Sequence, residues 1–219
     1  MANLSRQIGI ISLEQLESAK IINLIGVGGI GCPTALALGD MGIPGLRLFD
    51  DDIVEDHNRP TQILYRRTDL GRPKVEAAKE VLEMFTDAQI VPVQSRFDGT
   101  QDLEGIVVSA VDKMDQRMVI WKKIRYNINV PLYVEARMGA EVLRIYSLNP
   151  TDPEAVERYE KTLYTSEKAI QQRCTEKSII YTVLVAGGFI GGQVKKFLVG
   201  EQFYFEIIMD LKNMILMVE

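Results

Sequence analysis

Glycines and an acid early in the chain have the spacing of a nucleotide-binding turn. An apolar run ends at Ile25, and four glycines follow it directly: Gly26, Gly28, Gly29 and Gly31. Glycine lets the main chain approach an anion closely, and the free N–H groups of a following helix attract phosphate. Asp50 comes about twenty residues later, at the end of a second apolar run, where an acid binds a ribose hydroxyl. The pattern predicts a nucleotide site, and by itself it favours a dinucleotide.

A polar loop after Asp50 shifts that preference toward a triphosphate. Pro60 interrupts the loop, which supplies acids, amides and cations. Its candidate ligands are Asp52, Asn58, Arg59, Gln62, Arg66, Arg67, Arg72 and Lys74. Carboxylates would bind Mg²⁺ or ribose, while amides and cations would bind phosphate oxygens. Lys74 falls in the first turn of a predicted helix, where the dipole disfavours a cation unless an anion neutralises it. The alternative for the cations is a solvated loop.

Asp112 is the candidate metal ligand. It follows a predicted strand, 105–110, which is apolar as a central parallel strand should be. An acid just past the carboxyl end of such a strand lies on the ligand side of a doubly wound sheet. We therefore expect Asp112 to bind Mg²⁺, with capping of the next helix as the alternative.

The predicted elements determine how these residues are positioned. Apolar runs predict strands, and longer proline-free segments predict helices. Expected strands are 21–25, 46–49, 90–93, 105–110, 131–136, 142–148 and 203–211; expected helices are a short one capped by Ser12, then 34–41, 75–85, 116–126 and 178–198. The alternation predicts an α/β fold with a Rossmann-like, doubly wound, mostly parallel sheet and an antiparallel C-terminal extension. We expect a single domain over residues 1–219, with 149–173 as a polar surface excursion.

The composition excludes several classes of protein. A formal charge of −5 argues against general nucleic-acid binding, which needs a basic face. Cys32 and Cys174 lie far apart and the chain has one histidine, so we expect no structural zinc. The longest apolar run, 179–192, is too short to span a membrane, and no secretion signal is evident. We expect a cytoplasmic protein with neither a membrane nor a nucleic-acid partner.

Several motifs, taken together, are more specific than the glycines alone. They are SRQI (5–8), GVGGIG (26–31), DDDIVEDHN (50–58), GRPK (71–74), SAVDKMDQR (109–117) and CTEKSIIYTVLVAGGFIGGQVKKFL (174–198). In this order they resemble the ThiF/MoeB/ubiquitin-activating superfamily, over nearly the whole chain. Members of that superfamily use ATP to adenylate the C-terminal glycine of ubiquitin-like or sulfur-carrier proteins. The resemblance implies a small carrier protein ending in Gly-Gly as the partner.

The resemblance also implies roles for individual residues. Gly29 would contact the nucleotide and Asp50 the ribose, while Lys74 and Asn58 would contact phosphates and Asp112 would hold Mg²⁺. Arg6 corresponds to an arginine that reaches the ATP of the other subunit, which implies a homodimer. Cys174 corresponds to a nucleophilic or persulfide-accepting cysteine.

Departures from the family pattern keep other functions open. Thr61 replaces an expected arginine, for which Arg59 is a nearby substitute, and Lys113 replaces an expected asparagine. The zinc-binding cysteine pairs of many members are absent, so we expect a minimal, zinc-less member. The alternatives are an NAD-dependent oxidoreductase, a non-catalytic scaffold partner in a heterodimeric activating enzyme, and an ATP-dependent modifier of a small molecule, peptide or tRNA.

Overall fold

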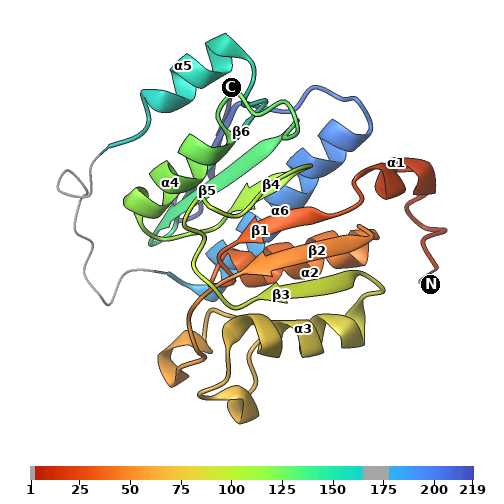
Figure 1. The fold of residues 1–219 in the computed structure, drawn as a ribbon, viewed down its shortest axis with the longest axis vertical. Helices are drawn as coiled ribbons and strands as arrows, with labels where there is room; N and C mark the ends of the chain where they lie inside the picture. Colours follow the sequence, from red (N-terminus) through yellow and green to blue (C-terminus); the bar gives the residue numbers. More distant parts are fainter. Residues whose placement is uncertain (1–2, 165–177) are drawn as a thin grey trace.

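One eight-stranded sheet forms the centre of the fold. The structure, a computed structural model, describes residues 3–164 and 178–219. The strands lie in the order β3-β2-β1-β4-β5-β6-β7-β8 (Figure 1). Their bounds are Ile22–Ile25 (β1), Gly45–Phe49 (β2), Gln89–Val93 (β3), Val107–Ser109 (β4), Tyr133–Gly139 (β5), Val142–Leu148 (β6), Glu206–Asp210 (β7) and Ile215–Val218 (β8). Neighbours among β3, β2, β1, β4 and β5 are parallel, whereas β6, β7 and β8 extend the sheet from β5 through antiparallel pairs. The predicted fold class is therefore confirmed.

Helices cover both faces of the sheet. They are Leu13–Ser18 (α1), Gly31–Met41 (α2), Lys74–Phe85 (α3), Met114–Ile124 (α4), Pro153–Glu160 (α5) and Ile180–Leu198 (α6), with short 3₁₀ turns at Asp56–Asn58 (η1) and Arg67–Asp69 (η2). Helices α2 and α6 lie behind the sheet in Figure 1, and α4 and α5 lie in front. Each face has its own apolar core. None of the helices in the described ranges combines the length and apolar character that a bilayer crossing requires.

Two segments differ from the sequence-based expectation. The predicted surface excursion 149–173 contains α5, whose Val156 and Tyr159 are buried in the front core, so that expectation is wrong for this helix. The predicted final strand is shorter than expected and is followed by β8, which sequence reasoning missed. Tertiary packing explains why α5 was expected at the surface. Only two of its eight side chains are buried, so the segment is mostly polar in sequence although it packs on the core.

The turn after β1 lies where the order of the strands reverses. Strand β1 pairs with β2 on one side and with β4 on the other, and all three are parallel. In open sheets of this type, ligands bind outside the carboxyl ends of the strands at such a switch point. The residues that follow Ile25, Phe49 and Ser109 therefore emerge together at one edge of the sheet.

A compact ion-pair cluster fixes the loop that leads into α3. The carboxylate of Asp69 is fully buried and accepts hydrogen bonds from Arg66 at 2.8 to 2.9 Å and from Arg72 at 2.8 Å. Glu80, on α3, pairs with the same two arginines and is half exposed. Hydrogen bonds from Arg66 hold the pKa of Asp69 at about 2, against an ordinary value of 3.8.

Asp69→Asn is expected to destabilise the protein. At neutral pH we expect the free energy of unfolding to fall by about 2 to 3 kcal/mol, because two arginines lose a buried partner. A lowered pKa in the folded state stabilises the fold above about pH 3.8, and this contribution is lost as the pH falls toward about 2. Urea unfolding of the variant should therefore show a weaker dependence on pH across that window.

The matched control is Glu80→Gln, which affects the same arginines from an exposed position. We expect a smaller loss of stability for this variant, since exposed ion pairs contribute little. Equal losses in the two variants would show that burial of Asp69 is not what makes the cluster stabilising.

Candidate functional site

The glycine turn between β1 and α2 forms a cradle at the switch point. Gly26 has φ +94°, and a Cβ there would lie 2.8 Å from the carbonyl oxygen of Ala110, beyond β4. A Cβ on Gly31 would lie 2.0 Å from the carbonyl oxygen of Gly26. The fold itself therefore requires these two glycines. A Cβ on Gly28 would meet none of the described residues within 4 Å, so packing within residues 3–164 and 178–219 does not explain that glycine.

Asp50, directly after β2, connects the cradle to the loop that follows. One carboxylate oxygen accepts a hydrogen bond from the amide of Val27 at 2.8 Å, and the other accepts one from the amide of Asp52 at 2.9 Å. Burial raises the pKa of Asp50, and the nearby ammonium group of Lys74 opposes that rise. The carboxylate is half-buried beside the cradle, and each of its oxygens keeps a lone pair that could accept from a ribose hydroxyl.

Lys74 lies on the same side of the sheet as Asp50. It is the first residue of α3, and its Nζ lies 2.8 Å from a carboxylate oxygen of Asp52. An antiparallel bridge between Ile53 and Pro73 brings the two residues together. The structure thus places three predicted site residues, Asp50, Asp52 and Lys74, in one connected group.

The loop after η1 contributes a hollow with unsatisfied polar atoms. The hollow, of about 250 Å³, is lined by Asp56, Arg59, Pro60 and Tyr65. Tyr65 adjoins the cradle, because its hydroxyl donates to the carbonyl of Val27 at 2.5 Å. Nη1 of Arg59 pairs with Asp56 at 2.8 Å, but its Nε is buried without a partner among the residues that the structure describes. Tyr65 was missed from the sequence, since its position depends on the path of the loop.

Two other polar side chains of this loop were also predicted to bind the nucleotide. The Oε1 atom of Gln62 is buried without a partner within the described part of the chain. Asn58 is buried, and its Oδ1 accepts from the amide of Glu55 at 2.9 Å, which leaves its amide N–H₂ group as a donor. Buried polar atoms without partners are rare in folded proteins, and Arg59 is also one of the residues that line the hollow. Arg66 and Arg72, in contrast, are occupied by the Asp69 cluster.

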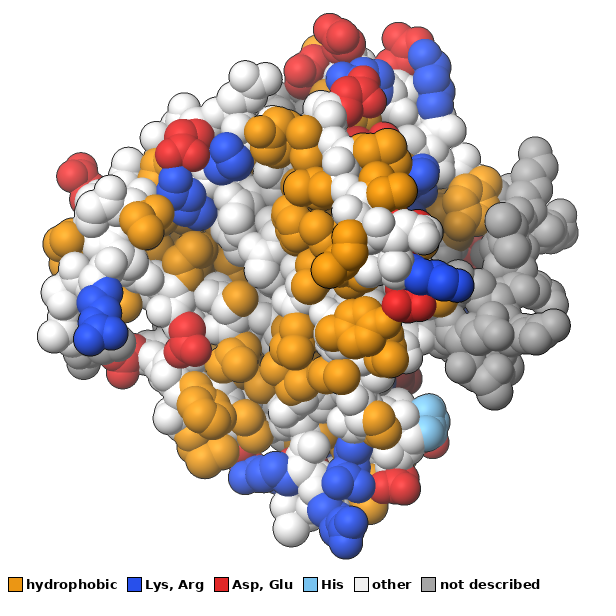
Figure 2. All heavy atoms as spheres, turned by 180° about the vertical axis from the view of Figure 1, so that it is seen from behind, with side chains coloured by type: hydrophobic (Ala, Val, Ile, Leu, Met, Phe, Trp, Pro, Cys, Tyr) orange, Lys and Arg blue, Asp and Glu red, His pale blue; other side chains and the backbone are white. Residues whose placement is uncertain are grey.

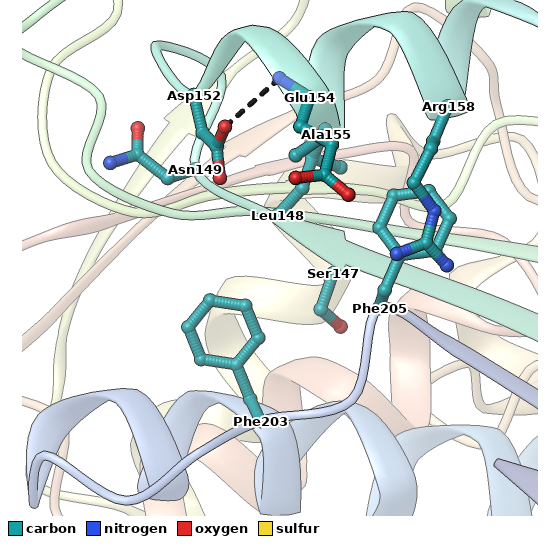
Figure 3. A pocket seen from close by; sticks show the side chains of 9 residues that line it. All are labelled: Ser147, Leu148, Asn149, Asp152, Glu154, Ala155, Arg158, Phe203 and Phe205. Atoms are coloured by element: carbon teal, nitrogen blue, oxygen red, sulfur yellow. Dashed lines mark hydrogen bonds between the residues drawn. The ribbon is translucent and has the colours of Figure 1, made fainter. Parts of the chain in front are cut away.

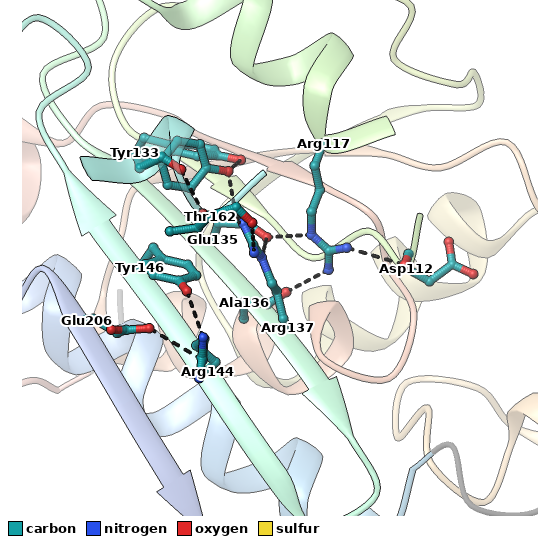
Figure 4. Close-up of polar contacts among 11 residues, drawn as sticks. Asp112, Arg117, Tyr133, Glu135, Ala136, Arg137, Arg144, Tyr146, Thr162 and Glu206 are labelled. Atoms are coloured by element: carbon teal, nitrogen blue, oxygen red, sulfur yellow. Dashed lines mark hydrogen bonds and ion pairs between the residues drawn. The ribbon is translucent and has the colours of Figure 1, made fainter. Parts of the chain in front are cut away.

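Asp112 lies at the carboxyl edge, in the turn between β4 and α4. Lys113, not Asp112, is the residue that precedes the first turn of α4, so Asp112 does not cap this helix. The Asp112 carbonyl accepts from Arg117 at 3.3 Å, while the side chain is exposed (Figure 4). Arg117 also contacts Glu135 and the carbonyl of Ala136 on β5. This network fixes the turn from which the Asp112 carboxylate projects.

The network beneath Asp112 is built on a fully buried acid. Burial alone would raise the pKa of Glu135, but Arg137 and Arg117 outweigh this effect and hold the pKa below its usual range. Arg137 continues the network to the carbonyl of Thr162 at 2.9 Å, after α5 (Figure 4). The turn that carries Asp112 is thereby connected to both β5 and the end of α5.

The carboxylates of Asp50, Asp51 and Asp52 all lie within 4.8 Å of one another. This group does not include Asp112, the metal ligand expected from the sequence. Both oxygens of Asp50 accept from main-chain amides, and Asp52 pairs with Lys74. Because the carboxylates of Asp50 and Asp52 already have these partners, we assign no metal to the three aspartates. The exposed carboxylate of Asp112 suits Mg²⁺, which prefers oxygen ligands.

One predicted site residue, Arg6, is not brought to the cradle. Gln7 donates to the carbonyl of Met41, and Leu4 packs against Gly42, which places the Arg6 segment at the C-terminal end of α2. The cradle is at the other end of this 11-residue helix, about 16 Å away at 1.5 Å per residue. Cys174 lies outside the described residues.

A second hollow, of about 270 Å³, lies at the opposite edge of the sheet (Figure 3). It lies between α5 and the chain before β7, and none of the predicted site residues lines it. Ser147 and Leu148 pair with the beginning of β5, so this hollow is at the amino edge of the parallel strands. Its acid Asp152 caps α5 by accepting from the amide of Glu154 at 3.0 Å, a structural role.

Comparisons with known proteins identify relatives of this chain in sequence and in fold. A sequence model of the ThiF family matches residues 2–214. The chain is similar to the adenylyltransferase and sulfurtransferase uba4 of Aspergillus clavatus, with 41% identity over 67% of this chain and 31% of the relative. It is 32% identical to the sulfur carrier protein ThiS adenylyltransferase of Escherichia coli, over 58% of this chain and 52% of the relative. The SAMP-activating enzyme E1 of Haloferax volcanii is 32% identical, over 54% and 45% respectively.

The matched region spans between about a third and a half of the length of these curated relatives. Among solved structures, E. coli MccB with ATP has a TM-score of 0.73 and 18% identity, and the match covers 94% of this chain and 64% of that one. At this level of identity the structural match supports the fold alone.

Gly28→Ala is expected to weaken nucleotide binding without unfolding the protein. The added methyl group meets nothing within 4 Å in the described part of the chain, so we expect the free energy of unfolding to change by no more than about 0.5 kcal/mol. It would, however, occupy the space in which a phosphate approaches the main chain, and we expect at least about a ten-fold loss of ATP affinity. Thermal unfolding and calorimetric titration with ATP measure the two effects.

Gly26→Ala provides the contrast, because it should lose stability through its positive φ and the clash with Ala110. If Gly28→Ala binds ATP as tightly as the unmodified protein, the cradle is not the phosphate site.

Proposed function

Because the chain belongs to the ThiF family, we propose that it uses ATP and Mg²⁺ to adenylate the C-terminal glycine of a small ubiquitin-like or sulfur-carrier protein. The observation that carries this proposal is the convergence of the cradle, Lys74 and the hollow with the unpartnered Nε of Arg59. These groups lie at one edge of the sheet and suit a triphosphate. The E. coli relative is by its name an adenylyltransferase of a sulfur carrier protein, which supports the same substrate class.

The proposed reaction forms an acyl-adenylate. An oxygen of the carrier's C-terminal carboxylate bonds to the α-phosphorus of ATP, the bond from that phosphorus to the bridging oxygen of the β-phosphate breaks, and pyrophosphate leaves. A terminal carboxylate, with a pKa of about 3.5, is ionised at neutral pH, so no strong general base is needed. The protein then has to align the reactants and neutralise the phosphate charge.

Most of the predicted site residues have a direct role in this proposal. Gly26, Gly28, Gly29 and Gly31 shape the cradle, Asp50 binds the ribose, Asn58, Arg59, Gln62 and Lys74 bind phosphates, and Asp112 would hold Mg²⁺. When bound, the ion would neutralise phosphate charge. Arg59 takes the place of the arginine that Thr61 replaces. Cys174 is the proposed nucleophile in a subsequent transfer step, in which its thiolate attacks the acyl carbon of the adenylate, a thioester forms and AMP leaves.

We also propose that the active form is a homodimer in which Arg6 serves the partner's site. The Arg6 segment is anchored at the far end of α2 from its own cradle. Figure 2 shows hydrophobic side chains gathered in a band across the face opposite to that of Figure 1, where α6 lies. Exposed apolar residues on this helix include Tyr181 and Leu184. Such a face is available for a second copy of the chain.

Pyrophosphate exchange tests the function. With Mg²⁺, labelled pyrophosphate and a carrier protein ending in Gly-Gly, we expect label to enter ATP. Removal of the carrier's last glycine should abolish exchange. Cys174→Ala should retain exchange and lose any covalent adduct with the carrier, because the cysteine acts after adenylation.

Parallel titrations with ATP and NAD separate the rival functions. Tight NAD binding without ATP binding would replace the proposal with an oxidoreductase. ATP binding without exchange for any carrier would favour the non-catalytic scaffold, as Thr61 and Lys113 suggest.

Mixing two inactive variants tests whether Arg6 acts in the partner's site. We expect Arg6→Ala and Lys74→Ala to be inactive when each is prepared alone. In mixed dimers, one site combines an intact Lys74 with an intact Arg6 from the other subunit, so co-expression should restore about a quarter of the wild-type exchange rate. A mixture that stays inactive, although mixed dimers are isolated by two affinity tags, would place Arg6 outside the reaction.

A further inference from the structure

Lys74 occupies an unfavourable position for a cation. It is the first residue of α3, where the helix dipole is positive, and 7% of its side chain is exposed. Its ammonium group carries three N–H donors, and one of them reaches Asp52 at 2.8 Å. Among the described residues the other two donors have no partner, and they are left for phosphate oxygens. The Asp52 carboxylate therefore offsets the unfavourable position without using all the hydrogen-bonding capacity of Lys74.

Asp52 is itself fixed by main-chain hydrogen bonds on both sides. Its amide donates to Asp50 at 2.9 Å, and its carbonyl accepts from the amide of Lys74 at 3.0 Å. Asp50 in turn accepts from Val27 in the cradle at 2.8 Å. An unbroken chain of hydrogen bonds thus runs from the cradle, through the two aspartates, to the ammonium group of Lys74. It determines where this ammonium lies relative to the cradle.

The Asp52–Lys74 pair is poorly placed to serve stability. The side chain of Asp52 is 66% exposed, and ion pairs with an exposed member contribute little to the free energy of unfolding. Asp51, the neighbouring acid, has a different environment, because its carboxylate lies 3.8 Å from Arg96. The two acids are adjacent in sequence and equal in charge, but Asp52 is the one paired with Lys74.

We propose that Asp52 is a positioning residue, which holds the ammonium group of Lys74 toward the phosphates instead of contacting the nucleotide itself. The inference rests on the proposed function, because it requires a phosphate ligand for Lys74. It assigns Asp52 a role different from the direct nucleotide contact expected from the sequence. Its effect should fall on phosphate recognition and not on the binding of adenosine.

Calorimetric titrations of Asp52→Ala and Asp51→Ala with Mg·ATP and with adenosine test this role. Both variants remove one negative charge from the same loop, so their long-range electrostatic effects on ATP are similar. We expect Asp52→Ala to lose about ten-fold or more in ATP affinity, the scale of one hydrogen bond to a charged group, and to bind adenosine unchanged. Asp51→Ala should show no loss in ATP affinity. Thermal unfolding should show that both variants are folded.

The Lys74→Met background isolates the contact. If Asp52 acts through Lys74, Asp52→Ala should cause no further loss of ATP affinity once Lys74 is removed. A loss that persists in this background would show that Asp52 contacts the nucleotide or its metal ion directly, and would overturn the inference. Equal ATP affinities for Asp52→Ala and Asp51→Ala would also overturn it, while leaving the proposed function intact. If the unmodified protein binds no ATP, both the inference and the proposed function fail.

Discussion

The carboxylate of Asp50, held between two main-chain amides, is the interaction on which the candidate site depends. It connects the turn after β1 to the loop after β2 through Val27 and Asp52. This connection requires Ile25 and Phe49 to be paired across the two strands, as they are. A shift of one residue would move Asp50 by about 3.3 Å and turn its side chain to the other face of the sheet. Burial of the alternating side chains on both faces prevents such a shift, so the two apolar cores determine the geometry of the site.

The positively charged side chains near the cradle form two groups with different roles. Arg66 and Arg72 are occupied by a buried carboxylate and an exposed one, and they hold the loop that leads into α3. Arg59 and Lys74 each have one acidic partner and keep other donors free. A donor that is already satisfied gains little from a phosphate, whereas a buried donor without a partner gains the full hydrogen bond. Of these four cations, Arg59 and Lys74 therefore have more to gain from a phosphate than Arg66 and Arg72.

Sequence patterns predicted the mostly parallel sheet, most of its strands and the members of the cradle, because local periodicity and glycine spacing encode them. They could not distinguish Gly28 from Gly26 and Gly31, since that difference depends on how closely Ala110 and the first turn of α2 approach. The pairing of Arg66 and Arg72 with Asp69 did have a sequence signal, because the three residues are spaced three apart. The sequence-based expectation named the two arginines but not Asp69. Strand β8 had a weak signal in its four-residue apolar run, but all four side chains are exposed, so no alternation between a buried and a solvated face marks it as a strand.

The N-terminal segment has two features that are not explained within a single subunit. Arg6 is anchored beyond the far end of α2 from its own cradle, and the apolar side chains of Ile8 and Ile10 beside it are 57% and 62% exposed. Exposed isoleucines close together are unfavourable in water, and burial of each against another surface would contribute about 1.5 kcal/mol or more. The proposed second subunit would cover these side chains and bring the arginine to a phosphate in the same step. Arg6, Ile8 and Ile10 lie within five positions of one another, so one contact with a second subunit would bury the isoleucines and place the arginine. Formation of the interface would then also complete the site. An isolated subunit would remain inactive even with ATP bound.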